Sequence, residues 1–170
     1  MRNWSAKNGF QVFLLLSGRS NVYLISKGEV NVMVDTAKTS SYHRLQENFK
    51  TVVSTSQQID LLVLTHTHFD HCQNAFNIQQ QYNCKVLMSE NEAEYAIKGY
   101  TPLPDGTIKL TKLISRVGNY IGKKRFAYHS FSPDVCMIEF YNYELGNFSI
   151  SIISTAGHSK GSVSIIVDNE

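Results

Sequence analysis

Short apolar runs recur along the first part of the chain, and each ends in a polar turn. The runs are QVFLLLS (11–17), NVYLIS (21–26) and VNVMVD (30–35), and Gly18 and Gly28 lie in the turns between them. Runs of β-branched and aromatic residues bounded by glycine-containing turns are typical of neighbouring antiparallel strands. The pattern therefore predicts a meander of three strands.

After residue 35 the apolar spacing lengthens to that of a helix, because Tyr42, Leu45 and Phe49 fall on one face of the segment 41–49. Next come a strand covered on both faces, a helix, a second strand and a second helix: IDLLVL (59–64), QNAFNIQQQYN (73–83), CKVLMS (84–89) and residues 89–98. Ser89 and Glu92 have the spacing of a capping box, which predicts the start of this last helix.

The segment 99–133 contains all three prolines and the basic run Lys123-Lys124-Arg125, and it predicts an irregular insertion with one helical piece. Three strand-like runs follow: VCMIEFYNYEL (135–145), NFSISIIST (147–155) and GSVSIIVD (161–168). Strands, then a strand–helix–strand–helix unit, then strands again predict a single mixed α/β layered domain over residues 1–170.

The composition is that of an ordinary globular chain, with 42% hydrophobic and 11% aromatic residues in 170. Sixteen basic and fourteen acidic side chains leave a formal charge of +2, so neither nucleic acid nor an acidic membrane is an expected partner. The three cysteines, at positions 72, 84 and 136, form no Cys-x-x-Cys pair and suggest no disulfide framework. A reducing compartment is therefore favoured.

The apolar run from Phe10 to Leu16 fits either a secretory signal peptide or a buried strand. A buried strand is favoured, because no strongly basic leader precedes the run and another strand-like run follows at once. No run approaches the length of a membrane span. We therefore expect a soluble, cytoplasmic protein.

The segment THTHFDH (65–71) concentrates three of the six histidines directly after a buried strand. In an extended chain His66 and His68 project to the same side, and two imidazoles on one face make half of a tetrahedral zinc site. Asp70 and His71 follow where the chain turns into a helix, and a carboxylate with an imidazole suits a second metal beside the first. The alternative is a set of loop histidines with Asp70 as a helix N-cap.

His158 lies in a Gly-His-Ser-x-Gly-Ser turn between two apolar runs. Gly157 and Gly161 permit a tight loop that directs one imidazole toward a site built elsewhere. Alone, such a residue is an ordinary turn histidine. Together with the first cluster, it supplies the missing third ligand of one zinc.

The segments VMVDT (32–36), THTHFDH (65–71) and TAGHSKGS (155–162), in that order, resemble the metallo-β-lactamase superfamily. The resemblance implies an α/β fold of the α+β type, a four-layer αβ/βα sandwich with the metals at one edge of the sheets. It implies that His66, His68 and His158 bind the first metal and that Asp70 and His71 bind the second. Asp35 matches an aspartate that supports the metal loop; a strand-end turn aspartate is the alternative.

The resemblance is incomplete toward the C-terminus. Family members carry a further bridging aspartate and a last histidine, whereas this sequence stops twelve residues after His158. Asp168 is a candidate bridge, but its position after SVSIIV favours the start of a hairpin. We therefore expect a truncated family member with an incomplete second half and an incomplete second metal site. Val163–Val167 should then be an edge strand, open to homodimerisation.

The expected function is that of a zinc hydrolase with one or two zinc ions, in which a metal-bound hydroxide attacks an ester, thioester, lactone or related bond of a small-molecule substrate. Asp70 would orient the hydroxide or receive its proton. The alternative is a catalytically impaired domain that binds metal or a partner without efficient turnover. Di-iron members of the superfamily carry glutamate where His68 stands, which argues against iron chemistry.

Four further features are interpreted as structural or surface groups: Cys72, His43, His129 and the basic run 123–125. Contact with an anionic substrate is the alternative for the basic run. A position near the metals is the alternative for Cys72, which is favoured as a small buried residue at a helix start.

Overall fold

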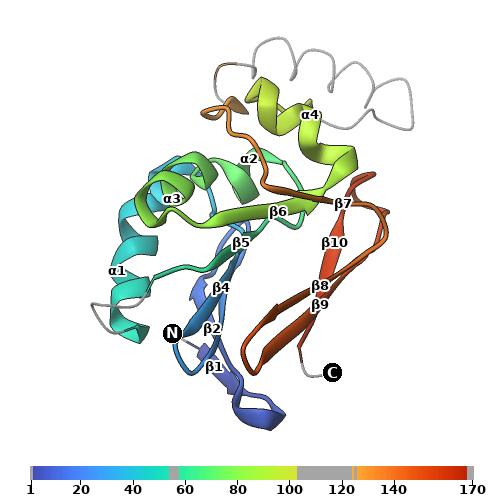
Figure 1. Ribbon diagram of the computed structural model, residues 1–170. Coiled ribbons are helices and arrows are strands. Elements are labelled where there is room, and N and C mark those ends of the chain that lie inside the picture. Colours follow the sequence, from blue (N-terminus) through green and yellow to red (C-terminus); the bar gives the residue numbers. More distant parts are fainter. Residues whose placement is uncertain (1, 54–57, 103–123, 125, 168–170) are drawn as a thin grey trace.

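The computed structural model describes residues 2–53, 58–102, 124 and 126–167, and its strands form two sheets (Figure 1). The first sheet has seven strands in chain order: β1 (Arg2–Ser5), β2 (Gln11–Leu16), β3 (Val22–Lys27), β4 (Val30–Val34), β5 (Leu61–Val63), β6 (Lys85–Ser89) and β7 (Val135–Met137). The second sheet has the order β10-β9-β8, with β8 (Phe140–Leu145), β9 (Phe148–Ser154) and β10 (Val163–Val167).

The described α-helices are α1 (Tyr42–Val52), α2 (Phe69–Cys72), α3 (Ala75–Tyr82) and α4 (Glu90–Lys98), and two short 3₁₀ turns are η1 (Lys7–Gly9) and η2 (Thr39–Ser41). The predicted meander is confirmed, because β2, β3 and β4 pair antiparallel. From β4 to β7 the neighbouring strands pair parallel.

Strand periodicity divides the apolar residues between two cores. Along β4, Met33 faces the helices while Val32 and Val34 face the second sheet, and β5 repeats this alternation with Leu62 against Leu61 and Val63. Residues two apart share a face of a strand, so a continuous apolar run fills both cores. Strand β5 is therefore covered on both sides, as the run 59–64 predicted, and β4 is covered in the same way.

The layers are helices, the seven-stranded sheet and the three-stranded sheet (Figure 1). The expected mixed α/β sandwich with an incomplete second half is confirmed, because no described helix covers the outer face of the second sheet. Within the described residues β10 pairs with β9 alone, so Val163–Val167 does lie at an edge.

Two strand predictions were wrong or incomplete. The run 135–145 is not one strand: β7 pairs with β6 in the first sheet and β8 pairs with β9 in the second, and the exposed Ile138 lies at the crossing. Strand β1 was not predicted, because all four of its residues are exposed and carry no apolar periodicity.

None of the described helices has the length and apolarity needed to cross a membrane. Most of the predicted insertion, the basic run apart from Lys124, and Asp168 lie outside the described residues.

Candidate metal centre

The carboxyl ends of the parallel strands β4, β5 and β6 meet at one edge of the sheet. Asp35 follows β4 directly, His66 and His68 follow β5, and α4 with Glu92 follows β6. Because parallel strands point the same way, residues distant in the sequence collect at this edge. The topology therefore places the histidine loop after β5 beside Asp35 and Glu92, which follow the two neighbouring strands.

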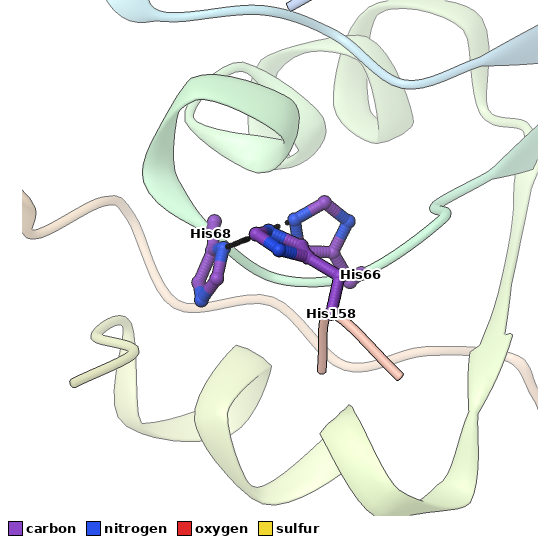
Figure 2. Close-up of side chains that lie close together, drawn as sticks. All are labelled: His66, His68 and His158. Atoms are coloured by element: carbon purple, nitrogen blue, oxygen red, sulfur yellow. Dashed lines mark hydrogen bonds between the residues drawn. The ribbon is translucent and has the colours of Figure 1, made fainter. Parts of the chain in front are cut away.

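Three imidazoles converge there (Figure 2). The Nε2 atom of His66 and the Nδ1 atom of His68 are 3.1 Å apart, and the same Nδ1 atom is 3.1 Å from Nε2 of His158. One ring nitrogen from each residue lies within 4.8 Å of the other two. Residues 92 positions apart in the chain thus present their nitrogens to one point, as the sequence predicted.

The ring of His66 is held by its other nitrogen, because Nδ1 lies 3.1 Å from the hydroxyl of Thr65. His66 is 5% exposed, and burial together with the neighbouring imidazoles lowers its pKa to about 3. Burial, followed by the charge of His158, also lowers the pKa of His68. His66 and His68 are therefore neutral near pH 7, the protonation state that a metal ion needs in its imidazole ligands.

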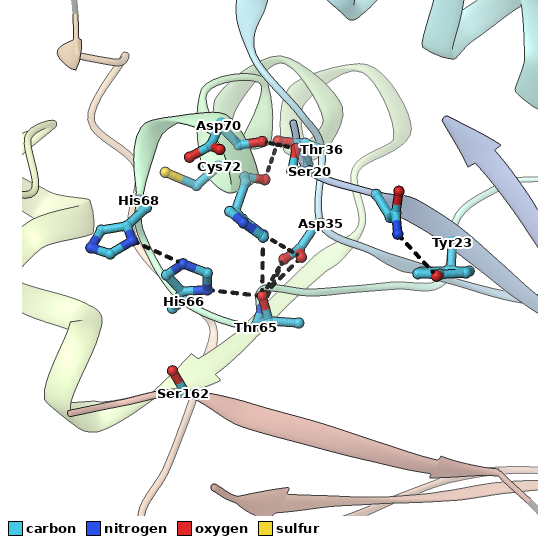
Figure 3. Close-up of polar contacts among 12 residues, drawn as sticks. Ser20, Tyr23, Asp35, Thr36, Thr65, His66, His68, Asp70, Cys72 and Ser162 are labelled. Atoms are coloured by element: carbon cyan, nitrogen blue, oxygen red, sulfur yellow. Dashed lines mark hydrogen bonds and ion pairs between the residues drawn. The ribbon is translucent and has the colours of Figure 1, made fainter. Parts of the chain in front are cut away.

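Asp35 supports the loop that carries these ligands (Figure 3). Its Oδ1 accepts the backbone N–H of Thr65 at 2.8 Å, and its Oδ2 accepts the Thr65 hydroxyl at 2.8 Å. The residue is 4% exposed and has a φ of 61°, a conformation that aspartate tolerates better than most residues. Asp35 is thus more than an isolated turn residue, since it fixes the start of the histidine loop.

The same carboxylate contacts His71, whose Nδ1 atom lies 2.7 Å from Oδ2 of Asp35. Burial lowers the pKa of His71, but the hydrogen bond and charge of Asp35 outweigh it, so that the net pKa is raised. The ring of His71 lies against that of His66, with 4.1 Å between centroids. His71 therefore lies beside the three converging histidines, and its Nδ1 atom is bonded to Asp35 rather than directed at them.

Asp70 lies in the turn after His68, with its side chain only 13% exposed. One carboxylate oxygen, Oδ2, pairs with Nε of Arg19 at 3.3 Å. The backbone oxygen of Asp70 accepts a hydrogen bond from the hydroxyl of Ser20. Among the described residues, neither Asp70 nor His71 joins the group formed by the three converging histidines.

Glu92 connects the two loops that carry the histidines. It is 2% exposed, and its Oε2 accepts the backbone N–H of Thr67 at 3.0 Å and the Thr67 hydroxyl. Its Oε1 accepts the N–H of Gly161 at 3.2 Å. The capping-box prediction was therefore half right: Ser89 caps α4 through the N–H of Asn91, whereas the carboxylate of Glu92 turns toward the histidine loops.

The turn that carries His158 is anchored on both sides. Thr155 N–H donates to the carbonyl of Ser162 at 2.8 Å, which closes the turn. Val163 N–H donates to the carbonyl of Thr65 at 3.0 Å, which joins the start of β10 to the first histidine loop. These contacts explain how an exposed turn histidine reaches a site built on another sheet.

Comparison with known proteins decides the family. The family model described as the metallo-beta-lactamase superfamily matches residues 17–170 of the chain. The chain belongs to the metallo-β-lactamase superfamily. A probable metallo-hydrolase of Methanocaldococcus jannaschii is 28% identical over 150 residues, which cover 88% of this chain and 63% of that protein. A metallo-beta-lactamase fold-containing protein of Sulfurisphaera tokodaii is 26% identical over 156 residues, which cover 88% of this chain and 54% of that protein.

Solved structures of the superfamily share the fold. The metallo-β-lactamase GOB-18 of Elizabethkingia meningoseptica aligns with a TM-score of 0.74 at 18% identity, over 98% of this chain and 56% of its own. The subclass B3 metallo-β-lactamase BJP-1 of Bradyrhizobium japonicum aligns with a TM-score of 0.73 at 18% identity, over 97% of this chain and 56% of its own. This member of the superfamily therefore spans somewhat more than half the length of the proteins that it matches.

The remaining sequence candidates of this superfamily member lie away from the three converging nitrogens. Cys72 is buried, donates its thiol to the carbonyl of Thr67 at 3.2 Å and has a strongly raised pKa because of burial, so it packs rather than reacts. His43 pairs with Glu47 on the exposed face of α1, and His129 stacks on Phe76. Glu92 is the residue that sequence reasoning missed, since Ser-x-x-Glu spacing fits an ordinary helix start equally well.

Proposed function

We propose that this chain carries the metal centre of a zinc-dependent hydrolase that cleaves an ester, thioester, lactone or related bond in a small molecule. The observation that carries the proposal is the convergence of one nitrogen each from His66, His68 and His158. Membership of the superfamily and a relative described as a probable metallo-hydrolase support it.

The donor set fits zinc. Zinc binds imidazole nitrogen at about 2.0–2.1 Å in tetrahedral geometry, which places neighbouring nitrogens roughly 3.3 Å apart. The two measured separations of 3.1 Å, from His68 to His66 and to His158, are close to that value. Three histidines also leave one of four positions open, as in catalytic rather than structural zinc sites.

When bound, zinc supplies a Lewis acid that acidifies a water molecule and polarises the bond under attack. The three histidines hold the ion, and Thr65 keeps the His66 ring turned so that Nε2 faces it. Asp70 is proposed to orient the attacking water or receive its proton. Burial lowers the pKa of His68 overall, and the charge of Asp70 offsets part of that lowering, which is consistent with a position close to the centre.

Asp70 and His71 are proposed as ligands of a second, weaker zinc site. The side of His71 that carries Nδ1 is bonded to Asp35, which leaves Nε2 as the nitrogen for a metal. Binding there would require the carboxylate of Asp70 to exchange part of its contact with Arg19.

A cytoplasmic location and a homodimer through β10 stay predictions.

Metal analysis with a hydrolysis assay tests the proposal. The chain is stripped with a chelator, re-loaded with zinc and analysed for metal per chain, and hydrolysis of 4-nitrophenyl acetate is followed. We expect one tightly bound zinc, slow zinc-dependent hydrolysis, and loss of both in His68→Ala. Zinc binding without any hydrolysis would favour the impaired domain, and no zinc binding would overturn the metal centre itself.

A further inference from the structure

A second feature of the same edge is a basic groove of about 590 Å³ beside the histidine loop. Its walls come from the β2–β3 turn, the segment before α1, the start of α2 and the chain near residue 126. Its lining includes three basic, two aromatic and one amide side chain: Arg19, Lys38, Lys124, Phe69, Phe126 and Gln73. The groove includes none of the three converging histidines.

All the charged side chains that line this groove are cations: Arg19, Lys38 and Lys124. Among the described residues, neither lysine forms an ion pair with an acidic side chain. Arg19 pairs with Asp70 through Nε, but a guanidinium has five N–H donors and retains others for a second acceptor. Three cations in one concavity raise the local concentration of anions.

The groove also has an apolar wall. The rings of Phe69 and Phe126 stack with 4.6 Å between centroids and 25° between planes, and the guanidinium of Arg19 lies 5.2 Å from the centroid of Phe69. The stacking fixes the side chain that directly follows His68. A planar or aliphatic part of a ligand can therefore lie on this wall while its charged end meets the cations.

The basic groove adjoins the surroundings of His71 at Arg19. Arg19 also lines a second groove of about 610 Å³, whose walls include Asp35, Thr65 and His71. Asp70, the proposed catalytic residue, is the ion-pair partner of the same arginine. The basic groove and the groove beside His71 thus meet at Arg19, next to Asp70.

We propose that the groove is the binding subsite for an oxyanionic group of the substrate, a carboxylate or a phosphate, so that the preferred substrate is an anionic ester or thioester. The identification of the anion as part of a substrate rests on the proposed function. The binding of an anion in the groove does not depend on it.

Kinetics with two matched esters provide the first test. The 4-nitrophenyl monoester of glutaric acid ends in a carboxylate, whereas 4-nitrophenyl pentanoate has the same chain length and no charge. The lysines are neutralised by Lys38→Gln and by Lys38→Gln with Lys124→Gln. The control is Lys85→Gln, which removes the same charge from the exposed, opposite end of β6. Arg19 is left intact because it holds Asp70.

We expect kcat/KM for the glutarate ester to fall about two- to five-fold per lysine, the range for an exposed charge pair, with most of the change in KM. The value for the pentanoate ester should stay constant in all variants, and Lys85→Gln should behave as the unaltered chain. An equal loss with both esters, or no loss with either, overturns the proposal.

A second test is independent of hydrolysis and of zinc. The metal-free chain is titrated with inorganic phosphate and, separately, with succinate, and amide chemical shifts are followed by NMR. We expect saturable shifts at Thr39, Ser40 and the Gln73 side chain, which Lys38→Gln weakens and Lys85→Gln preserves. The tighter of the two anions identifies the oxyanion. Saturable shifts at these residues would support the groove even if the zinc-loaded chain hydrolysed neither ester, a result that would overturn the proposed function alone. Scattered, non-saturating shifts would overturn the groove.

Discussion

Glu92 and Gly161 meet across 69 positions of sequence, where Oε1 of the carboxylate accepts the glycine N–H at 3.2 Å. The other oxygen of the carboxylate accepts two donors from Thr67, which lies between His66 and His68. Gly161 is three residues after His158. One buried carboxylate thus joins the two loops that carry the three converging histidines, and a hydrogen bond to a charged acceptor is stronger than a neutral one.

The first prediction concerns the charge of Glu92. In Glu92→Gln the amide presents an NH₂ group to donors that need an acceptor, so at least one of the Thr67 and Gly161 bonds is lost. We expect the free energy of unfolding of the metal-free chain to fall by about 1–3 kcal/mol. Zinc should bind at least about ten-fold more weakly, because supporting groups typically contribute 10–100-fold. Urea unfolding and competition with a chromogenic chelator measure the two effects.

The matched control is Glu90→Gln, an exposed glutamate in the same first turn of α4. It should leave both quantities nearly unchanged. If Glu92→Gln binds zinc as tightly as the unaltered chain, Glu92 does not position the ligands.

A second prediction follows from the space around Gly161. A Cβ atom there would lie 2.4 Å from Cγ of Glu92 and 3.0 Å from Cβ of Ser89, closer than packed atoms allow. Gly161→Ala should therefore push the His158 turn away from α4, lower stability by about 1–3 kcal/mol and weaken zinc binding. Gly18→Ala, where a Cβ meets nothing within 4 Å, is the control for chain stiffening. Equal stabilities of the two variants would contradict the tight contact.

The pair of Asp35 and His71 gives a prediction about pH. The pKa of His71 is net raised in the folded chain, because Asp35 outweighs the effect of burial. Protonated His71 therefore contributes stability that is fully present below its unfolded pKa of about 6.5 and is lost as the pH rises through the folded value. Asp35→Asn should remove this contribution, so the metal-free variant should lose more stability at pH 6 than at pH 9.

Asp35→Asn keeps a residue that tolerates the left-handed backbone, so the φ of 61° is not the cause of the loss. Urea unfolding at the two pH values measures the difference, and NMR titration of the His71 ring should show its pKa falling. A loss of stability independent of pH would mean that only the Thr65 bonds matter.

Zinc should itself stabilise the chain. A ligand that binds only the folded state adds RT ln(1 + [L]/Kd), about 2.7 kcal/mol at a free zinc concentration of one hundred times Kd. His68→Ala should abolish this gain, since His68 contacts both other ligands. His43→Ala, which alters an exposed histidine on α1, should retain it. Thermal unfolding with zinc and with chelator measures the gain, and an unchanged gain in His68→Ala would show that zinc binds elsewhere.

The sequence by itself determined the parts of this protein that depend on local patterns. The continuous apolar run 59–64 predicted a strand with two buried faces, and the spacing of His66 and His68 predicted two imidazoles on one side. The glycine turn around His158 marked it as a third candidate, and the structure brings its ring nitrogen to those of His66 and His68. The order of strands and helices predicted the layered α/β fold, which the two sheets bear out. Such features can be predicted from the sequence because the side-chain periodicity of a strand or helix involves only a few neighbouring residues.

Only the tertiary structure decided what distant segments do to one another. The run 135–145 divides between two sheets because β7 finds a partner in β6 and β8 finds one in β9, and no local pattern specifies a partner. Glu92 has the spacing of a helix cap, yet its carboxylate accepts donors from two loops that the fold places over α4. A buried carboxylate binds whichever donors surround it, and those donors are set by the packing of the whole chain.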